Sequence, residues 1–120
     1  MLCGCLVGVM SEGFRREIVQ QVVRNLLDLQ LLRIVGFGPS WGYAIKKRFE
    51  ADFGVRLRHA ALYSCLDVLR ERGFLECSSV RECGRNRKVY AITEAGRVYL
   101  ETYYRVLGAQ IAGAEAEKTG

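Results

Sequence analysis

A cluster of cations around a single amide lies late in this 120-residue chain. The stretch GRNRKVYAITEAG, residues 84–96, places Arg85, Asn86, Arg87 and Lys88 side by side, and Arg81 precedes them. Guanidinium and ammonium groups bind phosphate oxygens, so this pattern favours a nucleic-acid partner. The alternative interpretation is an exposed loop whose charges serve only solubility.

The net charge of +5 originates in the middle of the chain. Between residues 46 and 88, eleven lysines and arginines stand against six acidic residues, whereas the rest of the chain carries seven of each sign. A basic block can be no more than a solvated face of a folded domain. Its position nevertheless favours a polyanionic partner, most simply nucleic acid.

Catalytic and metal-binding residues are sparse in this sequence. His59 is the only histidine, and there is no phosphate-binding glycine loop, nucleophile–base constellation or carboxylate pair in a plausible cleft. Cys3 and Cys5 are too close together for a structural zinc knuckle. We therefore expect no enzymatic activity, no cofactor and no metal site, and we expect His59 to make a polar contact at a helix start.

The remaining cysteines raise a question of redox state. In a reducing cytoplasm all five cysteines are expected to be free thiols, with Cys65 as a small core residue. A hairpin that turns near Val80 would place Cys77 opposite Cys83. In a hyperthermophilic source, a disulfide between these two would brace the hairpin.

Hydrophobic periodicity predicts the elements that position these residues. Apolar residues recur at helical spacing over residues 12–35, which predicts one long, largely buried helix. The stretch GFGPSWG then ends it, and Ser40 is expected to cap a second helix over residues 41–53, with Gly54 as its stop signal. Trp41 and Tyr43 are expected to pack between helices, and the alternative is that they serve as stacking platforms.

The second half of the chain predicts a helix, a hairpin and another helix. VRLR, residues 55–58, suggests a strand-like bridge, and residues 59–72 a third helix. FLECSSV and RKVYAIT predict two strands joined by the loop RECGRNR, and Thr93 can cap a last helix that ends near residue 112. The expected domain limits are a flexible lead-in (1–11), a DNA-binding domain (12–92), a dimerisation helix (93–112) and a frayed tail (113–120).

Three helices followed by a two-stranded hairpin form a winged helix-turn-helix, a mainly α arrangement within the α+β class. Four segments, in order, resemble the PadR family of transcriptional regulators: GPSWGYAIKKRFE, ALYSCLDVLRERGFLE, GRNRKVYAIT and TEAGR. The resemblance spans about residues 27–100. It implies a sequence-specific, double-stranded DNA-binding regulator, typically a repressor, whose third helix enters the major groove and whose last helix forms a homodimer.

The candidate DNA-binding residues are basic or hydrogen-bonding groups on the second helix, at the start of the third helix and on the wing. The major groove, about 12 Å wide, admits one helix whose first residues face base edges, while a cationic wing suits the backbone or the minor groove. These residues are Lys46, Lys47, Arg56, Arg58, His59, Ala60, Tyr63, Ser64, Arg81, Arg85, Asn86, Arg87 and Lys88. The family often has Ser-Pro-Gly-Thr where this chain has residues 58–61, so the resemblance does not supply an operator sequence.

Apolar side chains on the first and last helices exceed what a small core can cover, which predicts a homodimer. The candidate dimerisation residues are Ile18, Val22, Leu100, Tyr103, Tyr104, Leu107 and Ile111. Tyr99, Tyr103 and Tyr104 form either a packing surface or the lining of a pocket for an unknown small-molecule effector.

The alternative function is a winged-helix module that binds protein within a transcription complex, because a fold does not fix a function. An apolar third-helix face would favour that alternative, whereas the cations favour DNA. The apolar run at residues 1–10 is too short to cross a bilayer and lacks the features of a signal peptide, so we expect a cytoplasmic protein without a membrane partner.

Overall fold

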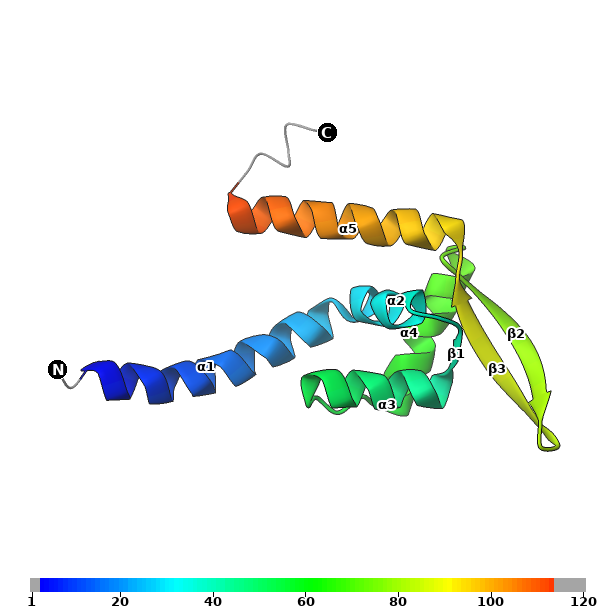
Figure 1. Ribbon diagram of the computed structural model, residues 1–120, viewed down its shortest axis with the longest axis horizontal. Helices are drawn as coiled ribbons and strands as arrows, with labels where there is room; N and C mark the ends of the chain where they lie inside the picture. The colour runs from blue at the N-terminus through cyan, green and yellow to red at the C-terminus, as the bar shows by residue number, and fades with distance from the viewer. Residues whose placement is uncertain (1–2, 114–120) are drawn as a thin grey trace.

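The computed structural model describes the backbone of residues 3–113 and the side chains of residues 12–113. Over this range the chain forms five helices and a three-stranded antiparallel sheet (Figure 1). The elements are α1 (Cys3–Asn25), α2 (Leu27–Gly36), β1 (Ser40–Trp41), α3 (Gly42–Phe53), α4 (His59–Glu71), β2 (Leu75–Glu82), β3 (Arg85–Ile92) and α5 (Glu94–Ala112). The α+β winged-helix prediction is confirmed.

The predicted single helix over residues 12–35 is instead two helices that meet at a bend. Leu26 takes φ −112° and ψ 40°, outside the helical region, between α1 and α2. The amides of Leu26 and Gln30 still donate to the carbonyls of Val22 and Leu26, so hydrogen bonding continues across the bend. The apolar pattern also continues, which is why periodicity alone predicted one helix.

Burial differs sharply across this bend. In α2, Leu31 and Leu32 are fully buried, whereas Phe14, Ile18 and Val22 on α1 are 44–55% exposed. The prediction of a largely buried first helix therefore holds for α2 and is wrong for most of α1. Helix α1 begins at Cys3, within the predicted lead-in, and residues 1–2 and 114–120 of the predicted lead-in and tail lie outside the described range.

The core lies between α2, α3, α4 and one face of the sheet. Its fully or almost fully buried side chains come from each of these elements: Leu31, Leu32, Val35, Ile45, Phe49, Leu62, Leu66, Leu69 and Tyr90. This packing fixes the orientation of α4 relative to the hairpin. Gly54 adopts a left-handed conformation, φ 65°, at the end of α3, which confirms its predicted role as stop signal.

Ser40 does not cap α3, contrary to the prediction. It lies in β1 opposite Tyr90 of β3, and its hydroxyl donates to the Gly38 carbonyl instead. Trp41 occupies the N-cap position without a side-chain hydrogen bond. Strand β1 was not predicted, because its partners, Val89 and Tyr90, lie far along the chain in β3.

Residues 55–58 form no strand, although their alternation is real. Val55 and Leu57 are buried, and Arg56 and Arg58 are exposed. The Leu57 amide donates to Oε2 of Glu50 at 2.9 Å, so a side-chain carboxylate on α3 replaces the expected strand partner. This interaction holds the extended segment that leads into α4.

The hairpin is longer and its turn tighter than predicted. Strands β2 and β3 pair from Leu75 with Ile92 to Glu82 with Arg85, leaving only Cys83 and Gly84 in the turn, with φ 52° and 77°. Two residues with positive φ match the twist of a hairpin. The predicted turn near Val80 is therefore wrong. Cys77 lies opposite Tyr90 and both cysteines are free, so the predicted disulfide is also wrong.

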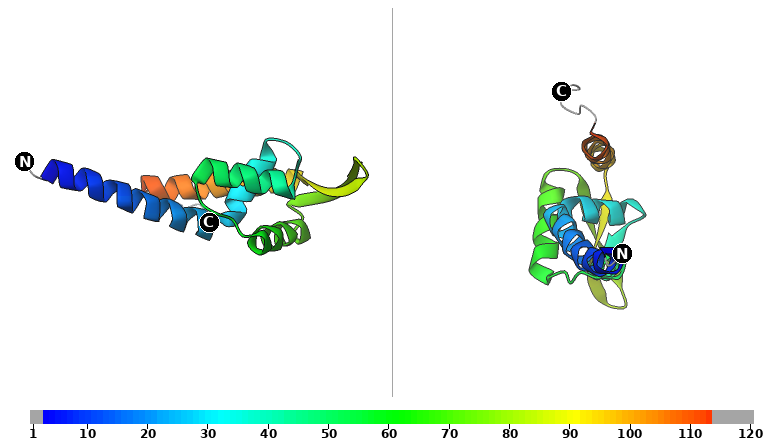
Figure 2. Two further views of the ribbon diagram at one scale, coloured as in Figure 1. Left: turned by 90° about the horizontal axis from the view of Figure 1, so that it is seen from below. Right: turned by 90° about the vertical axis from the view of Figure 1, so that its left-hand side faces the viewer.

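Helix α5 begins at the predicted cap and extends away from the core. The Gly96 amide donates to Oγ1 of Thr93 at 3.0 Å, and that hydroxyl donates to the Gly73 carbonyl at 2.6 Å. Figures 1 and 2 show α1 and α5 extending from the same side of the body. The radius of gyration is 17.7 Å, against about 14 Å expected for a compact domain of this length. The protomer is thus elongated by these two helices.

Candidate nucleic-acid interface

The first turn of α4 presents short and polar side chains to solvent. Arg58 is its N-cap residue with extended backbone, φ −70° and ψ 142°, and Arg58, His59, Ala60 and Ser64 are exposed. The opposite side of the helix carries Leu62, which is buried. The predicted third helix thus exposes its first turn, as a helix that enters a groove must.

Tyr63 is placed differently from its predicted neighbours. It is half-buried, and its ring and hydroxyl pack against Gly42 at the start of α3, where an added Cβ would overlap the hydroxyl and lie 2.6 Å from Cζ of Tyr63. The exposed His59 ring lies over it, with centroids 4.5 Å apart. Tyr63 therefore joins α4 to α3, and this contact explains why a glycine precedes Tyr43 in the WGY motif.

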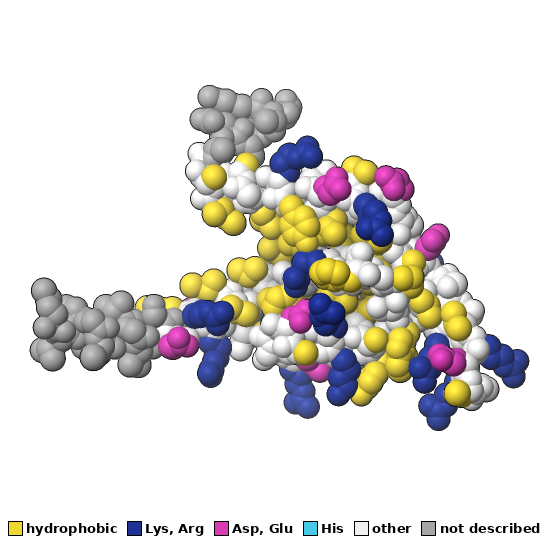
Figure 3. All heavy atoms as spheres, in the orientation of Figure 1, with side chains coloured by type: hydrophobic (Ala, Val, Ile, Leu, Met, Phe, Trp, Pro, Cys, Tyr) yellow, Lys and Arg dark blue, Asp and Glu magenta, His cyan; other side chains and the backbone are white. Residues whose placement is uncertain are grey.

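The wing carries cations on both of its faces. Arg81 pairs with Asn86 and Glu82 with Arg85 next to the turn, and all four side chains are exposed. Because successive side chains of a strand point to opposite faces, Arg81, Asn86 and Lys88 share one face, and Arg85 and Arg87 share the other. Figure 3 shows Lys and Arg side chains at the end of the wing and along the edge of the body beneath α3.

The base of the wing is anchored in the core by Tyr90. This side chain is only 2% exposed, and its burial raises the pKa of the hydroxyl to about 12. Ile92 packs against the same core cluster. The wing is therefore fixed at its base and free at its tip.

Two aromatic side chains lie beside the wing, and their position was not predicted. The Arg87 guanidinium lies 4.0 Å from the Trp41 ring centroid, Trp41 lies 5.4 Å from the Tyr43 centroid, and Nζ of Lys47 lies 5.4 Å from Tyr43. Tyr43 is 51% exposed. The prediction that Trp41 and Tyr43 pack between helices is wrong. We call Arg87, Trp41, Tyr43 and Lys47 the cation–aromatic row.

The cations of this surface have no acidic partners. Among residues 12–113, the ion pairs are Arg48 with Asp52 and Arg70 with Asp67, and none of the candidate DNA-binding residues takes part. Lys46 is half-buried and Lys47 exposed on α3. The described acidic side chains thus leave the positive charge of this surface unneutralised.

The candidate dimerisation residues fall into two groups. Ile18, Val22, Tyr104 and Ile111 are exposed, Ile111 at 86%. The other three are half-buried: Leu100, Tyr103 and Leu107. Leu100 packs against the core, and the Tyr103 hydroxyl donates to Oδ1 of Asp28 at 3.3 Å. Burial next to Asp28 raises the pKa of Tyr103. The half-buried Leu100 and Tyr103 therefore help to fix α5 to the body within one protomer.

Tyr99 packs against Phe74 and also borders a shallow surface hollow. Its ring stacks on Phe74 with centroids 4.2 Å apart, and the Arg72 guanidinium lies 5.1 Å from it. A surface hollow of about 210 Å³ lies beside it, lined by Tyr99, Thr102, Tyr103 and Val106. Tyr104 does not line this hollow.

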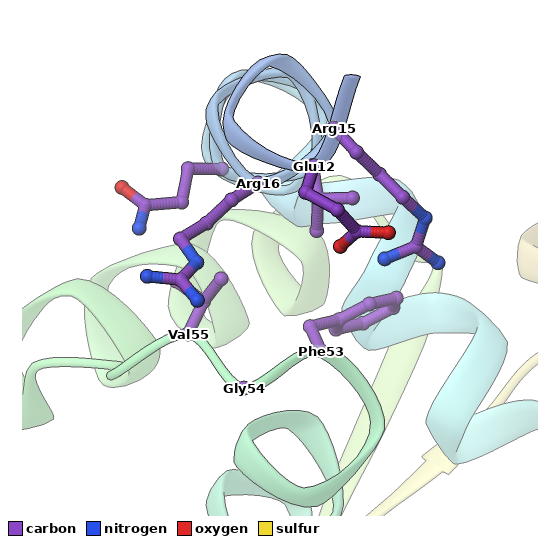
Figure 4. Close-up of a pocket in the computed structure, with 8 residues that line it drawn as sticks. Glu12, Arg15, Arg16, Phe53, Gly54 and Val55 are labelled. Atoms are coloured by element: carbon purple, nitrogen blue, oxygen red, sulfur yellow. The ribbon is translucent and has the colours of Figure 1, made fainter. Parts of the chain in front are cut away.

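A second hollow, of about 500 Å³, separates α1 from the turn after α3. Figure 4 shows Arg16 reaching from α1 toward Val55, with Glu12 and Arg15 above Phe53. It lies at the far end of α3 from the cation–aromatic row. Within residues 3–113, no helix is long and apolar enough to span a bilayer. Among the side chains of residues 12–113, no three from His, Cys, Asp or Glu are grouped to hold a metal ion.

Comparison with known families identifies the chain. The model described as "Transcriptional regulator PadR-like family" matches residues 31–102, more than half of the sequence. The chain belongs to this PadR-like family. The match runs from α2 into α5 and contains α4, the wing and the cation–aromatic row, whereas α1 lies outside it.

Solved structures share the PadR-like fold. A protein from Thermoplasma acidophilum is 29% identical, with a TM-score of 0.68 over 77% of this chain and 87% of its own. A PadR family transcriptional regulator from Eggerthella lenta is 24% identical, with a TM-score of 0.66 over 88% and 95%. Bacillus subtilis PadR in complex with operator DNA is 23% identical, with a TM-score of 0.60 over 66% of this chain and 45% of its own. No curated protein matches the sequence significantly.

Proposed function

We propose that this PadR-like protein is a sequence-specific DNA-binding transcriptional repressor that acts as a homodimer in the cytoplasm. The observation that carries the proposal is the set of unpaired cations on a winged helix, at the start of α4 and on the wing. Such charges bind backbone phosphates and release counterions. The complex of Bacillus subtilis PadR with operator DNA, which has the same fold, supports a DNA ligand.

In this proposal α4 binds in the major groove, and the wing binds phosphates or the minor groove. Arg58, His59, Ala60 and Ser64 enter the major groove, where Arg and His can bond to base edges. The wing residues Arg81, Arg85, Asn86, Arg87 and Lys88, together with Arg56, Lys46, Lys47 and the Tyr63 hydroxyl, contact phosphates or the minor groove. Residues 12–92 form the DNA-binding domain.

The dimer would form through α1 and α5. Their exposed apolar side chains, including Ile18, Val22, Tyr104 and Ile111, lie on helices that project from the core. A twofold axis between two protomers would place two α4 helices on one side of the duplex and favour an inverted-repeat operator. Residues 93–112 are the main dimerisation helix.

The first test is binding of the purified protein to the DNA upstream of its own gene and to a random duplex. Fluorescence anisotropy from about 50 to 300 mM salt gives both affinity and salt slope. We expect tighter, salt-sensitive binding to the upstream fragment. Equal salt-sensitive binding to both duplexes would contradict a local operator, and no binding at low salt would favour a protein-interaction module.

A further inference from the structure

The cation–aromatic row connects the wing to the start of α3. Arg87 belongs to β3, Trp41 to β1, and Tyr43 and Lys47 to the first turns of α3. The two cations lie at the ends of the row and the two aromatic rings between them, with successive separations of 4.0, 5.4 and 5.4 Å. Arg87 and Lys47, which are distant in the sequence, thus each contact one of two adjacent aromatic rings.

Sheet register explains why Arg87 meets Trp41. Trp41 pairs with Val89, and Arg87 lies two residues before Val89 on the same face of β3. Diagonal neighbours on one face of an antiparallel pair are within reach of aromatic and long side chains. The pairing of β1 with β3 therefore brings the Trp41 indole beside the Arg87 side chain.

The contact leaves the phosphate-binding edge of Arg87 free. A guanidinium that stacks on a ring uses its flat face, while its N–H donors point outward in the plane. None of the hydrogen bonds or ion pairs formed by residues 12–113 engages the Arg87 side chain. Arg87 is half-buried, whereas Arg85 on the same face is exposed and contacts no aromatic ring.

We propose that Trp41 is a positioning residue for DNA binding, which holds Arg87 so that its guanidinium edge meets a backbone phosphate. Tyr43 continues the row, with Nζ of Lys47 5.4 Å from its ring centroid. The indole removes rotamers that a free arginine would lose on binding, so the contact is formed at a lower entropic cost. This role rests on the proposed DNA-binding function and extends it to residues without charge.

A double-mutant cycle tests the coupling. The variants are Trp41→Leu, Arg87→Ala and the two combined, with Trp41→Phe as the conservative variant. Arg85→Ala, alone and with Trp41→Leu, is the matched control because it removes the nearby cation that has no aromatic support. Each variant is titrated with the DNA fragment that wild type binds, over the same salt range, after its thermal unfolding has been checked.

We expect Arg87→Ala to reduce the log–log salt slope of the proposed homodimer by about 1.8 and its affinity by about 25- to 100-fold near 0.1 M salt, the effect of one lost phosphate contact in each protomer. Trp41→Leu should weaken binding severalfold, the combined variant no more than Arg87→Ala alone, and Trp41→Phe should retain most of the affinity. In the Arg85 control, the affinity losses of the two single variants should multiply in the combined variant. If the losses of Trp41→Leu and Arg87→Ala multiplied in the same way, the proposal would be overturned. No DNA binding by wild type would instead reject the proposed function itself.

The only tryptophan of the chain gives a readout that needs no DNA. In the free protein, Arg87→Ala should change the emission of Trp41, whereas Arg85→Ala should leave it unchanged. Addition of the bound fragment should change the wild-type emission further. Identical spectra for wild type and Arg87→Ala would contradict the contact even if Trp41→Leu failed to fold.

Discussion

Gly96 in the TEAGR motif lies where α5 passes the end of α4. A Cβ at this position would overlap the Phe74 carbonyl oxygen and lie 2.7 Å from Cγ1 of Ile92. The backbone of Phe74 cannot move freely, because its carbonyl accepts from Thr93 and its amide donates to Leu69. The glycine is thus required by close packing, although its backbone is helical.

Gly96→Ala should therefore destabilise the protein, by about 1–3 kcal/mol as overpacked sites do. Gly108→Ala in the same helix is the matched control, since nothing lies within 4 Å of its added Cβ. That change should leave the protein unchanged or stabilise it by up to about 1 kcal/mol. Chemical denaturation at one protein concentration measures both, and equal effects at the two sites would reject the packing argument.

The described cysteines differ in expected reactivity. Burial, with Asp28 nearby, raises the pKa of Cys65 from 9.0 to about 11, while Cys83 is exposed in the hairpin turn. Because the thiolate is the reactive form, iodoacetamide at pH 8 should modify Cys83 well before Cys65. Peptide mapping over time measures the two rates, and denaturant should abolish the difference.

The raised pKa also links stability to pH. Folding favours the protonated Cys65 thiol, so the contribution of this group to the free energy of unfolding is fully present below pH 9.0, the pKa of an ordinary thiol. That contribution is lost as the pH rises toward about 11, the pKa of Cys65 in the folded protein. Equal labelling of Cys65 and Cys83 in the native protein would contradict this burial.

At the scale of elements, α4 and the wing should affect DNA binding differently. Replacing Arg87 and Lys88 with Ala removes two cations from each protomer, so affinity should fall for all sequences and the salt slope of the proposed homodimer should decrease by about 3.6. Replacing His59 with Ala should mainly change the preference between duplexes, by about 1–3 kcal/mol at one base pair. Arg105→Ala, an exposed cation on α5, is the control.

These effects can be separated by measuring each variant on the preferred and the random duplex at several salt concentrations. The wing assignment fails if the double variant binds both duplexes as wild type does. The α4 assignment fails if His59→Ala weakens both by one common factor.

The order of the elements was predictable from local patterns, whereas their pairing was less so. The helix stop at Gly54, the cap at Thr93 and the hairpin all follow from residues within one or two turns. Strand β1 and the Trp41–Arg87 contact depend on a register between residues 40–41 and 89–90. The turn at Cys83 and Gly84 was missed because four nearby charged residues resembled a longer loop.

The candidate site shows the same division. Exposure of Arg58, His59 and Ser64 could be predicted from the helical spacing of the leucines on α4. The packing of Tyr63 on Gly42 could not, since it joins two helices whose crossing is set by the whole core.

At the scale of the whole molecule, the projecting helices predict self-association. Ile18→Glu places a charge on the exposed apolar side of α1 and should weaken the dimer at least tenfold, because the carboxylate would lose water without gaining a partner. Val68→Glu, at a valine of similar exposure on α4, is the control. Sedimentation equilibrium measures both, and an unchanged dissociation constant for Ile18→Glu would exclude this part of α1 from the interface.

The bend at Leu26 also separates residues that must pack in the core from exposed residues of α1 that need not. Within the described side chains of α1, Val23 is buried in the core, and the exposed residues before it, such as Phe14 and Ile18, can diverge without repacking the domain that carries α4. In the proposed homodimer, changes in this part of α1 would therefore alter which chains pair while leaving the proposed DNA-binding surface on α4 and the wing intact. Where several such regulators share a cell, α1 is the element in which separate pairing can arise at the least cost to folding.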